Sequence, residues 1–457
     1  MTTARRLAIV ALSALSLIVT AAPAPGSPDT SAWTWAPMYF SGVASPSVSV
    51  ANDTVRALKV AGDDLYVGGD FTGFAGGFNR DYIARWNSID QQWHSLGGTV
   101  ESGKITGGIV YAIEVSGDNV YVGGNFTLTD STGTSFHNFA YFNLASETWH
   151  GFAGSSSADL IADGEVRTIF ADEPSGLLYV GGSFNNANDL ENADNLIVGS
   201  FSLCGTVMSA CVVEVPHVSV CGGVSISCAI DVPTIWSAVG DDGAGGPALS
   251  SFVSSIARHP DGDLLISGDF GAAGGVAGAN SLVKLSYTDH YVWTAESAPS
   301  ISMYPIGRLN TDAYVGAWED VYRRGSSGTW SAICPDALHT PGRVWGAVTP
   351  LTSTLVLAAR SEQLVACNPE SGQATILPGY PTVTAMARFG DDLIVAGSAD
   401  LGSLGSVGDY IAIIQHIPFG DLPATDRDGR QRTNTLALLT ALTALTALAG
   451  TQLLRRS

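Results

Sequence analysis

The sequence predicts an all-β protein, a single β-propeller of about seven four-stranded blades that is closed by its N-terminal strand and followed by a C-terminal transmembrane helix. Three observations predict the propeller: a strand motif that recurs, an isolated strand before the first repeat, and a composition rich in glycine. The 457 residues include 53 glycines, and 46% are hydrophobic while 14% are charged. This composition suits many short buried strands joined by tight turns, and one closed array can use a chain of this length.

The repeat consists of two short strands around Leu-Tyr-Val-Gly-Gly-x-Phe, a polar loop, a third strand and a fourth strand with a tryptophan. In the first copy the motif is Leu65 to Phe71, and Trp93 lies seven residues after Trp86. The second copy keeps this spacing between Phe142 and Trp149. Later copies, of which the fifth and sixth are less regular, follow at 178–184, 264–270, 313–318, 355–359 and 393–397. We expect the Gly-Gly pair to let the chain leave the sheet with unusual dihedral angles, and the tryptophans to pack between blades.

The last repeat lacks its fourth strand, whereas the strand at residues 33–38 stands alone before the first repeat. Trp35-Ala-Pro-Met matches the fourth strand Trp93-His-Ser-Leu of the first copy. We therefore expect residues 33–38 to complete the last blade, which would close the ring and remove its open edges. A parallel β-helix is the alternative fold.

The third copy contains an insertion, because Trp236 lies 35 residues after Phe201 rather than seven. This cysteine-rich insertion, residues 204–233, separates the third and fourth strands of that blade. Cysteines in an exported protein predict disulfides, although zinc is an alternative for the four in the insertion. Their connectivity stays open, while the last two cysteines are interpreted as a further pair. The disulfide candidates are Cys204, Cys211, Cys221, Cys228, Cys334 and Cys367.

The two ends of the chain predict export and a membrane tether. Residues 1–24 have the pattern of a signal peptide, and the propeller would span residues 25–417, followed by a polar linker at 418–432. Residues 433–454 carry no charge and would form a helix of about 33 Å, with the short tail 455–457 in the cytoplasm. A glycolipid-anchor signal is the alternative. Either tether would hold the propeller at the cell surface, on the non-cytoplasmic side.

The charge balance excludes one class of partner. The chain has 42 acidic and 21 basic residues, a net charge of −21. Such a field repels nucleic acid, which we do not expect as a partner. Asn52 and Asn125 begin N-glycosylation sequons, which agree with export.

The run Leu65-Tyr-Val-Gly-Gly-Asp-Phe, followed by Ile83-Ala-Arg-Trp-Asn and Trp93-His-Ser-Leu-Gly, resembles the propeller repeats of the fungal cortical cell-polarity marker proteins and their kelch-like bacterial relatives. Residues 33–417 carry this resemblance. It implies an extracellular propeller that is held by one C-terminal span and acts as a positional landmark or surface scaffold. It supplies no catalytic residues.

The sequence contains no nucleophile elbow, phosphate-binding loop, zinc-protease motif or EF-hand loop, so we assign no catalytic residue and favour a role without catalysis. We predict a binding, adhesion or positional scaffold module for a protein or glycan partner. The alternatives are a glycan-processing enzyme with carboxylates at the propeller mouth, and a passive surface coat component. His94 and His150 follow repeat tryptophans and are expected on blade surfaces.

Loops between second and third strands should share one face of the propeller with the connections between blades, and ligands of such scaffolds usually bind there. Carboxylates in these loops suit calcium or sugars, with solvated turn residues as the alternative; no metal site and no other cofactor is assigned. The residues after each Gly-Gly are expected to cap turns, namely Asp70, Asn125, Ser183 and Asp269. The ligand-face candidates are Asp81, Asp130, Asp189, Glu191, Asp194, Asp400 and Asp409.

Overall fold

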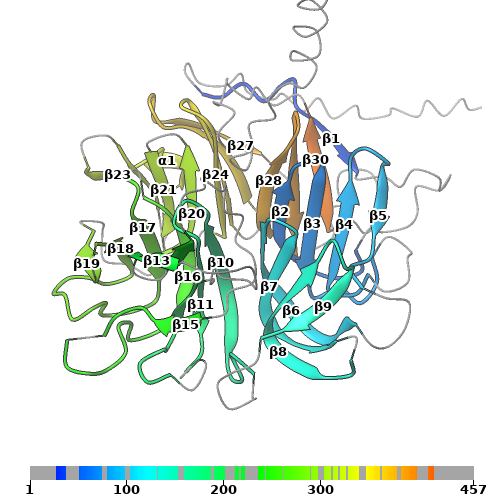
Figure 1. The fold of residues 1–457 in the computed structure, drawn as a ribbon. Coiled ribbons are helices and arrows are strands. Elements are labelled where there is room, and N and C mark those ends of the chain that lie inside the picture. The colour runs from blue at the N-terminus through cyan, green and yellow to red at the C-terminus, as the bar shows by residue number, and fades with distance from the viewer. Residues whose placement is uncertain are drawn as a thin grey trace, which may run out of the picture.

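The described residues of the computed structural model form seven four-stranded antiparallel sheets and one separate two-stranded hairpin (Figure 1). The predicted signal peptide at 1–24 and the predicted span at 433–454 lie outside the described residues. No helix within the described part of the chain is long and apolar enough to cross a membrane. The structure describes residues 27–37, 51–74, 80–97, 103–130, 132–152, 159–185, 187, 190–200, 211–215, 218–221, 235–241, 243–259, 261–288, 290–296, 303–309, 312–317, 320–325, 328–338, 346–360, 363–377, 382–398 and 410–415.

Each sheet is one blade, with its strands in chain order from the centre to the rim. Blades 1 to 3 are β2 (Val55–Ala61), β3 (Asp64–Gly69), β4 (Ile83–Asn87) and β5 (Gln92–His94); β6 (Lys104–Ser116), β7 (Asn119–Thr129), β8 (Ser135–Asn143) and β9 (Thr148–Gly151); and β10 (Glu165–Asp172), β11 (Leu177–Ser183), β12 (Leu196–Ser200) and β15 (Ile235–Ala238).

The remaining blades keep the same order, except that the last blade takes its fourth strand from the N-terminus. Blades 4 to 7 are β16 (Val253–Arg258), β17 (Leu264–Gly268), β18 (Leu282–Tyr287) and β19 (Tyr291–Ala295); β20 (Met303–Leu309), β21 (Asp312–Ala317), β22 (Val321–Arg324) and β23 (Trp330–Ala332); β24 (Ala347–Thr352), β25 (Leu355–Arg360), β26 (Gln363–Asn368) and β27 (Gln373–Leu377); and β28 (Val383–Phe389), β29 (Asp392–Gly397), β30 (Ile411–Gln415) and β1 (Thr34–Pro37).

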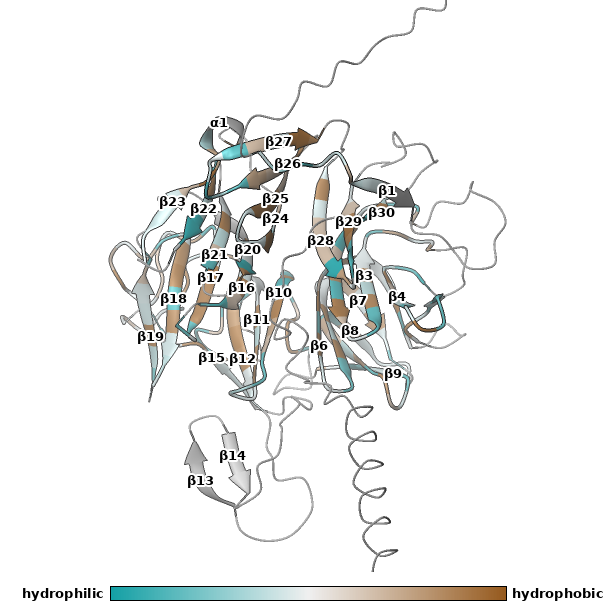
Figure 2. Cartoon of the chain, turned by 90° about the horizontal axis from the view of Figure 1, so that it is seen from above, coloured by the Kyte–Doolittle hydropathy of each residue, from teal (hydrophilic) through white to brown (hydrophobic). Residues whose placement is uncertain are grey.

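The blades form a closed ring. Each first strand contacts the first strand of the next blade, and β28 of blade 7 contacts β2 of blade 1. Figure 2 shows first strands such as β10, β16 and β20 toward the centre and the fourth strands β9, β19, β23 and β27 at the rim. The ring is closed as the sequence predicted, because Trp35 of β1 pairs with Ile414 of β30 in antiparallel register. These contacts confirm the seven-bladed propeller.

The Gly-Gly pair of the repeat serves close packing rather than unusual dihedral angles. A Cβ on Gly68 would lie 2.5 Å from Cγ1 of Val110 in the next blade, and one on Gly123 would lie 2.3 Å from Val166. A Cβ on Gly69 would lie 2.1 Å from the carbonyl oxygen of Thr54 in the same sheet. Neither Gly68 nor Gly69 has a positive φ. The expectation about dihedral angles was therefore wrong, since what the pair provides is room for the neighbouring strand and blade.

Aromatic side chains fill the space between blades. The Trp149 ring is fully buried, and its Nε1 donates a hydrogen bond to the Leu96 carbonyl oxygen of the preceding connection at 2.8 Å. Trp236 of blade 3 packs edge-on against Phe139 of blade 2. His94 lies on a blade surface, where it is paired with an exposed aspartate at 2.8 Å. The tryptophans therefore pack between blades and His94 lies on a blade surface, as the sequence predicted.

A hairpin occupies the insertion between β12 and β15. It consists of β13 (Cys211–Val215) and β14 (Val218–Cys221), and its register places Cys211 opposite Cys221. Cys204 and Cys228 lie outside the described residues. The helix α1 (Pro335–Leu338) follows β23.

Cys334 at the end of blade 5 and Cys367 in β26 of blade 6 form a disulfide bond that joins the two blades. We expect replacement of both cysteines by alanine to lower the free energy of unfolding by about 3–4 kcal/mol, because the bond closes a loop with a sequence separation of 33. Urea unfolding of both proteins under non-reducing conditions measures this loss of unfolding free energy. An unchanged midpoint would contradict the prediction.

Candidate functional site

We call the face that carries the loops between second and third strands the loop face. Of the acidic residues expected to bind ligands there, four are described and lie in blades 1 to 3, whereas Asp189, Asp400 and Asp409 lie outside the described residues. Asp81 precedes β4, Glu191 is exposed, and Asp194 precedes β12. No group of three or more His, Cys, Asp or Glu side chains within the described ranges is arranged to hold a metal ion.

Asp130 caps its own turn. Its Oδ1 accepts hydrogen bonds from the backbone N–H groups of Thr132 at 2.8 Å and Thr134 at 2.9 Å. Burial by itself raises the pKa of this carboxyl, but the bonds from Thr132 and Thr134 outweigh it and hold the pKa below its usual value. Asp130 therefore has a structural role in the β7–β8 turn.

The prediction that Asp70 caps a turn was wrong. Its carboxylate accepts two hydrogen bonds from the Arg56 guanidinium, at 2.5 Å from Nε and 2.6 Å from a terminal nitrogen. Arg56 reaches it because a β-bulge between Val55 and Ala57 adds an extra residue to the first strand. Such bulges redirect side chains, and no local sequence feature distinguishes this ion pair from a turn cap.

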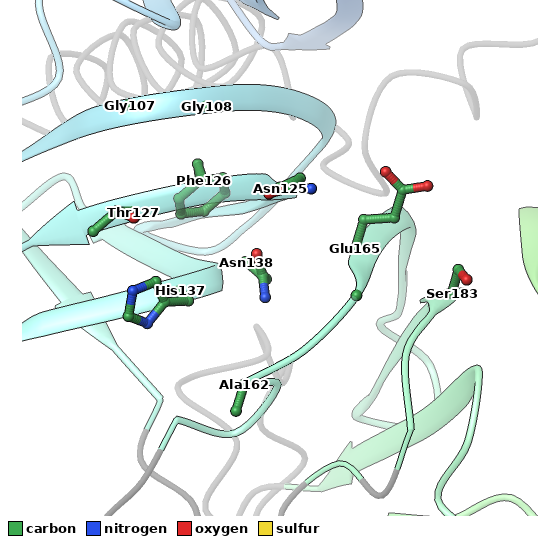
Figure 3. Close-up of a pocket in the computed structure, with 11 residues that line it drawn as sticks. Gly107, Gly108, Asn125, Phe126, Thr127, His137, Asn138, Ala162, Glu165 and Ser183 are labelled. Atoms are coloured by element: carbon green, nitrogen blue, oxygen red, sulfur yellow. The ribbon is translucent and has the colours of Figure 1, made fainter.

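A polar pocket of about 570 Å³ opens between blades 2 and 3 (Figure 3). Figure 3 shows Asn125, Asn138 and His137 on the blade 2 side and Glu165 and Ser183 on the blade 3 side. The pocket is lined by Gly107, Gly108, Asn125, Phe126, Thr127, His137, Asn138, Ala162, Gly164, Glu165 and Ser183.

Blade 2 forms one wall because its strands are longer than the repeat predicts. The repeat predicts a polar loop after Phe126 that contains Asp130, but β7 continues to Thr129 and β8 begins at Ser135. Phe126 and Leu128 alternate into the core, where both are buried. Alternate residues of a strand point to opposite faces, so Asn125 and Thr127 face the pocket together. This alternation of apolar and polar residues was the signal in the sequence that the prediction of a loop overlooked.

His137 forms a polar pair with Asp159 at the pocket. The ring nitrogen Nδ1 of His137 lies 2.5 Å from Oδ2 of Asp159, whose side chain is only 14% exposed. Asn138 holds the segment that carries Asp159, because its Nδ2 donates to the Ile161 carbonyl oxygen at 3.1 Å. Since Asp159 occupies Nδ1, the other ring nitrogen, Nε2, is available to a ligand in the pocket.

Sequence reasoning missed His137 because the histidines are scattered along the chain. The structure shows that His137 occupies the same repeat position as Asp81 and Asp194. Each of the three precedes a residue with positive φ, namely Tyr82 (65°), Asn138 (63°) and Asn195 (63°). An alignment of the blades at this position would have shown that blade 2 carries a histidine where blades 1 and 3 carry an aspartate.

Blade 3 forms the opposite wall. Glu165 pairs with Ser183 across β10 and β11, and its carboxylate accepts a hydrogen bond from Arg167. The Arg167 guanidinium lies 5.7 Å from the Tyr111 ring and 4.9 Å from the Phe252 ring. The charge of Glu165 is therefore balanced, and the wall is polar without a large net charge.

The fold and the pocket define the class of protein: a closed seven-bladed β-propeller with a polar pocket between blades 2 and 3 on its loop face. The family model of the Rax2 C-terminal beta propeller domain matches residues 38–163. This match covers blades 1 and 2 and confirms the resemblance to the cortical cell-polarity marker family. No curated protein matches the sequence.

Solved structures with similar folds have low sequence identity to this chain. YCF48 from Cyanidioschyzon merolae is 10% identical with a TM-score of 0.46, over 84% of this chain and 98% of that chain. A catalytically inactive virginiamycin B lyase from Staphylococcus aureus with quinupristin is 10% identical with a TM-score of 0.43, over 84% and 99%. A GH74 xyloglucanase from Xanthomonas campestris is 14% identical with a TM-score of 0.47, over 80% and 53%.

Proposed function

We propose that the protein is a propeller tethered at the cell surface that binds a protein or glycan partner in the pocket between blades 2 and 3, as a binding, adhesion or positional scaffold module. The observation that carries this proposal is the His137–Asp159 pair at the pocket. The partly buried carboxylate of Asp159 fixes the imidazole ring of His137, so the site presents an oriented hydrogen-bonding group and the entropic cost of ordering it is reduced. Convergent polar groups in a pocket of this size are typical of ligand sites.

The direction of the strands supports an outward-facing pocket. Third strands begin at the loop face and end at the opposite face, because neighbouring strands of a blade are antiparallel. β30 is the third strand of blade 7, so the chain leaves the propeller on the face opposite the pocket. In Figure 1 the β7–β8 hairpin lies at the lower edge, whereas β30 and β1 lie toward the upper edge. A tether that follows residue 415 would then leave the loop face turned away from the membrane.

The composition of the pocket favours binding over glycosidic hydrolysis. Glu165 is the one carboxylate among the described residues that line it, and Arg167 engages that group. Hydrolysis of a glycosidic bond ordinarily uses two carboxylates that flank the bond. The neighbouring carboxylate of Asp159 is bonded to His137, so both carboxylates at the pocket are already paired, which supports recognition without turnover.

The test is a screen of glycans and surface proteins against the full chain, produced through a secretory pathway, with and without calcium. For a selective ligand we expect His137→Gln and Glu165→Gln each to weaken binding about tenfold, because each removes a hydrogen bond to the ligand. Glu191→Gln is the matched control, since this exposed residue lies outside the pocket. Binding that Glu191→Gln weakens as much as His137→Gln would locate the site elsewhere, and a folded protein without ligands would favour a coat role.

A further inference from the structure

We infer that an N-linked glycan on Asn125 covers the pocket between blades 2 and 3 and controls access to it. The inference rests on the export contained in the proposed function, but it does not depend on which ligand the pocket binds. It combines the sequon Asn125-Phe126-Thr127 with the position of that sequon in the pocket wall.

The strand geometry exposes the acceptor asparagine while burying the residue beside it. Phe126 is 3% exposed and belongs to the core of blade 2, so the side chains of Asn125 and Thr127 lie on the other face of β7. Asn125 itself is exposed. A sugar attached to its amide nitrogen would therefore extend over the pocket rather than into the sheet.

The sequon at Asn52 differs from the sequon at Asn125, because hydrogen bonds hold its asparagine side chain. The Asn52 side chain is engaged on both of its polar atoms, since its Oδ1 accepts from the Thr72 backbone N–H at 3.0 Å and its Nδ2 donates to Thr72 Oγ1 at 3.2 Å. No comparable bond holds the Asn125 side chain among the described residues. Attachment of a glycan at Asn125 would break no hydrogen bond that the fold uses.

The sequon and His137 belong to the same pocket wall, so the first sugars on Asn125 would cover His137. Thr127 is the direct partner of His137 between β7 and β8, and Asn125 lies two residues before Thr127 on the same face. The β7–β8 pairing is interrupted between Gly123 and Thr127, so Asn125 has no partner on β8, and Asn125 and His137 line the same pocket. A Cβ on Gly107, which lines the pocket, would meet no other atom within 4 Å, so space is open beside the sequon.

The experiment measures the accessibility of His137 and needs no ligand. The full chain would be produced in a eukaryotic secretory host, treated with diethyl pyrocarbonate, and analysed by peptide mass spectrometry for glycan occupancy and for carbethoxylation of each histidine. The variant Thr127→Ala removes the sequon and keeps Asn125, whereas Thr127→Ser keeps the sequon. Asn125→Gln provides a second way to remove the glycan, and His94 on blade 1 is the internal reference.

We expect Asn125 to be glycosylated, and His137 to react about threefold or more slowly in the wild type and in Thr127→Ser than in Thr127→Ala and Asn125→Gln, because a glycan is a bulky solvated group. His94 should react equally in all four proteins. Equal rates at His137 despite full occupancy would overturn the shielding and leave the binding proposal intact. An unmodified Asn125 in the exported protein would overturn the inference outright.

Discussion

Removing residues 27–37 is expected to open the propeller ring and to lower the free energy of unfolding by about 3–5 kcal/mol from the loss of Trp33 alone. Trp33 is 9% exposed and packs into the core shared by blades 6 and 7, including Leu355 and Ile414. The same segment is held at its start, where Thr375 Oγ1 donates to the Pro28 carbonyl oxygen at 2.8 Å. The deletion also leaves β30 as an unpaired edge, so aggregation should increase.

The measurement is urea unfolding followed by circular dichroism, together with light scattering of the native protein. Trp33→Ala separates the loss of packing from the loss of the strand, because it leaves β1 able to pair with β30. Thr294→Ala is the control, since Thr294 is exposed on the fourth strand of blade 4 and its substitution should change stability little. If the truncated protein unfolded at the same urea concentration as the full chain, the closure of the ring by β1 would not contribute to stability.

Glu296→Gln is expected to lower the free energy of unfolding by about 3–5 kcal/mol, because it leaves the largely buried Arg324 guanidinium without its counter-charge. The Glu296 side chain is 6% exposed and lies between blades 4 and 5. It accepts hydrogen bonds from Arg324 Nε at 3.1 Å and Trp330 Nε1 at 2.9 Å, and its other oxygen lies 3.4 Å from Nε2 of the buried His259. The substitution removes the negative charge that faces all three groups.

The matched control is Asp90→Asn, which breaks the exposed pair with His94, where the aspartate is 44% exposed. Exposed ion pairs contribute less than about 1 kcal/mol, so the two variants should differ clearly in urea midpoint. Similar midpoints for both variants would mean that the blade 4–blade 5 network adds nothing beyond a surface pair.

The contacts of Glu296 also predict that the stability of the protein depends on pH. Burial by itself raises the pKa of Glu296, but the nearby His259, the hydrogen bond from Trp330 and the charge of Arg324 outweigh it, so the net pKa lies below its ordinary value of 4.5. The Glu296 carboxyl group therefore binds a proton less tightly in the folded state than in the unfolded state. The stabilisation that ionised Glu296 gives to the folded state is fully present above about pH 5 and is lost as the pH falls through the pKa of Glu296 in the folded state. The stability difference between wild type and Glu296→Gln should therefore shrink in acid, and a difference that stays constant down to about pH 3 would contradict this account.

The repeat spacing was sufficient to predict the blades, because each blade is specified by local strands and turns. Alternating apolar residues, the Gly-Gly motif and the tryptophan seven residues after the third strand all act within about 50 residues. The closure of the ring could also be predicted, since an incomplete last repeat and an isolated first strand match one another. The extended strands of blade 2 were missed, because polar residues such as Thr127 and Thr129 on one face were interpreted as a loop.

The sequence by itself thus determined the fold class, the number of blades and the partner strands at the ring closure. The site depended on tertiary structure. His137 and Asp159 lie on different sides of the β9 strand in the chain, and only the packing of the blade 2–blade 3 connection against β8 brings them within 2.5 Å. Likewise, Glu296 meets Arg324 only because blades 4 and 5 pack together. Local periodicity fixes which strands pair within a blade, whereas polar contacts between blades depend on side-chain directions that no repeat encodes.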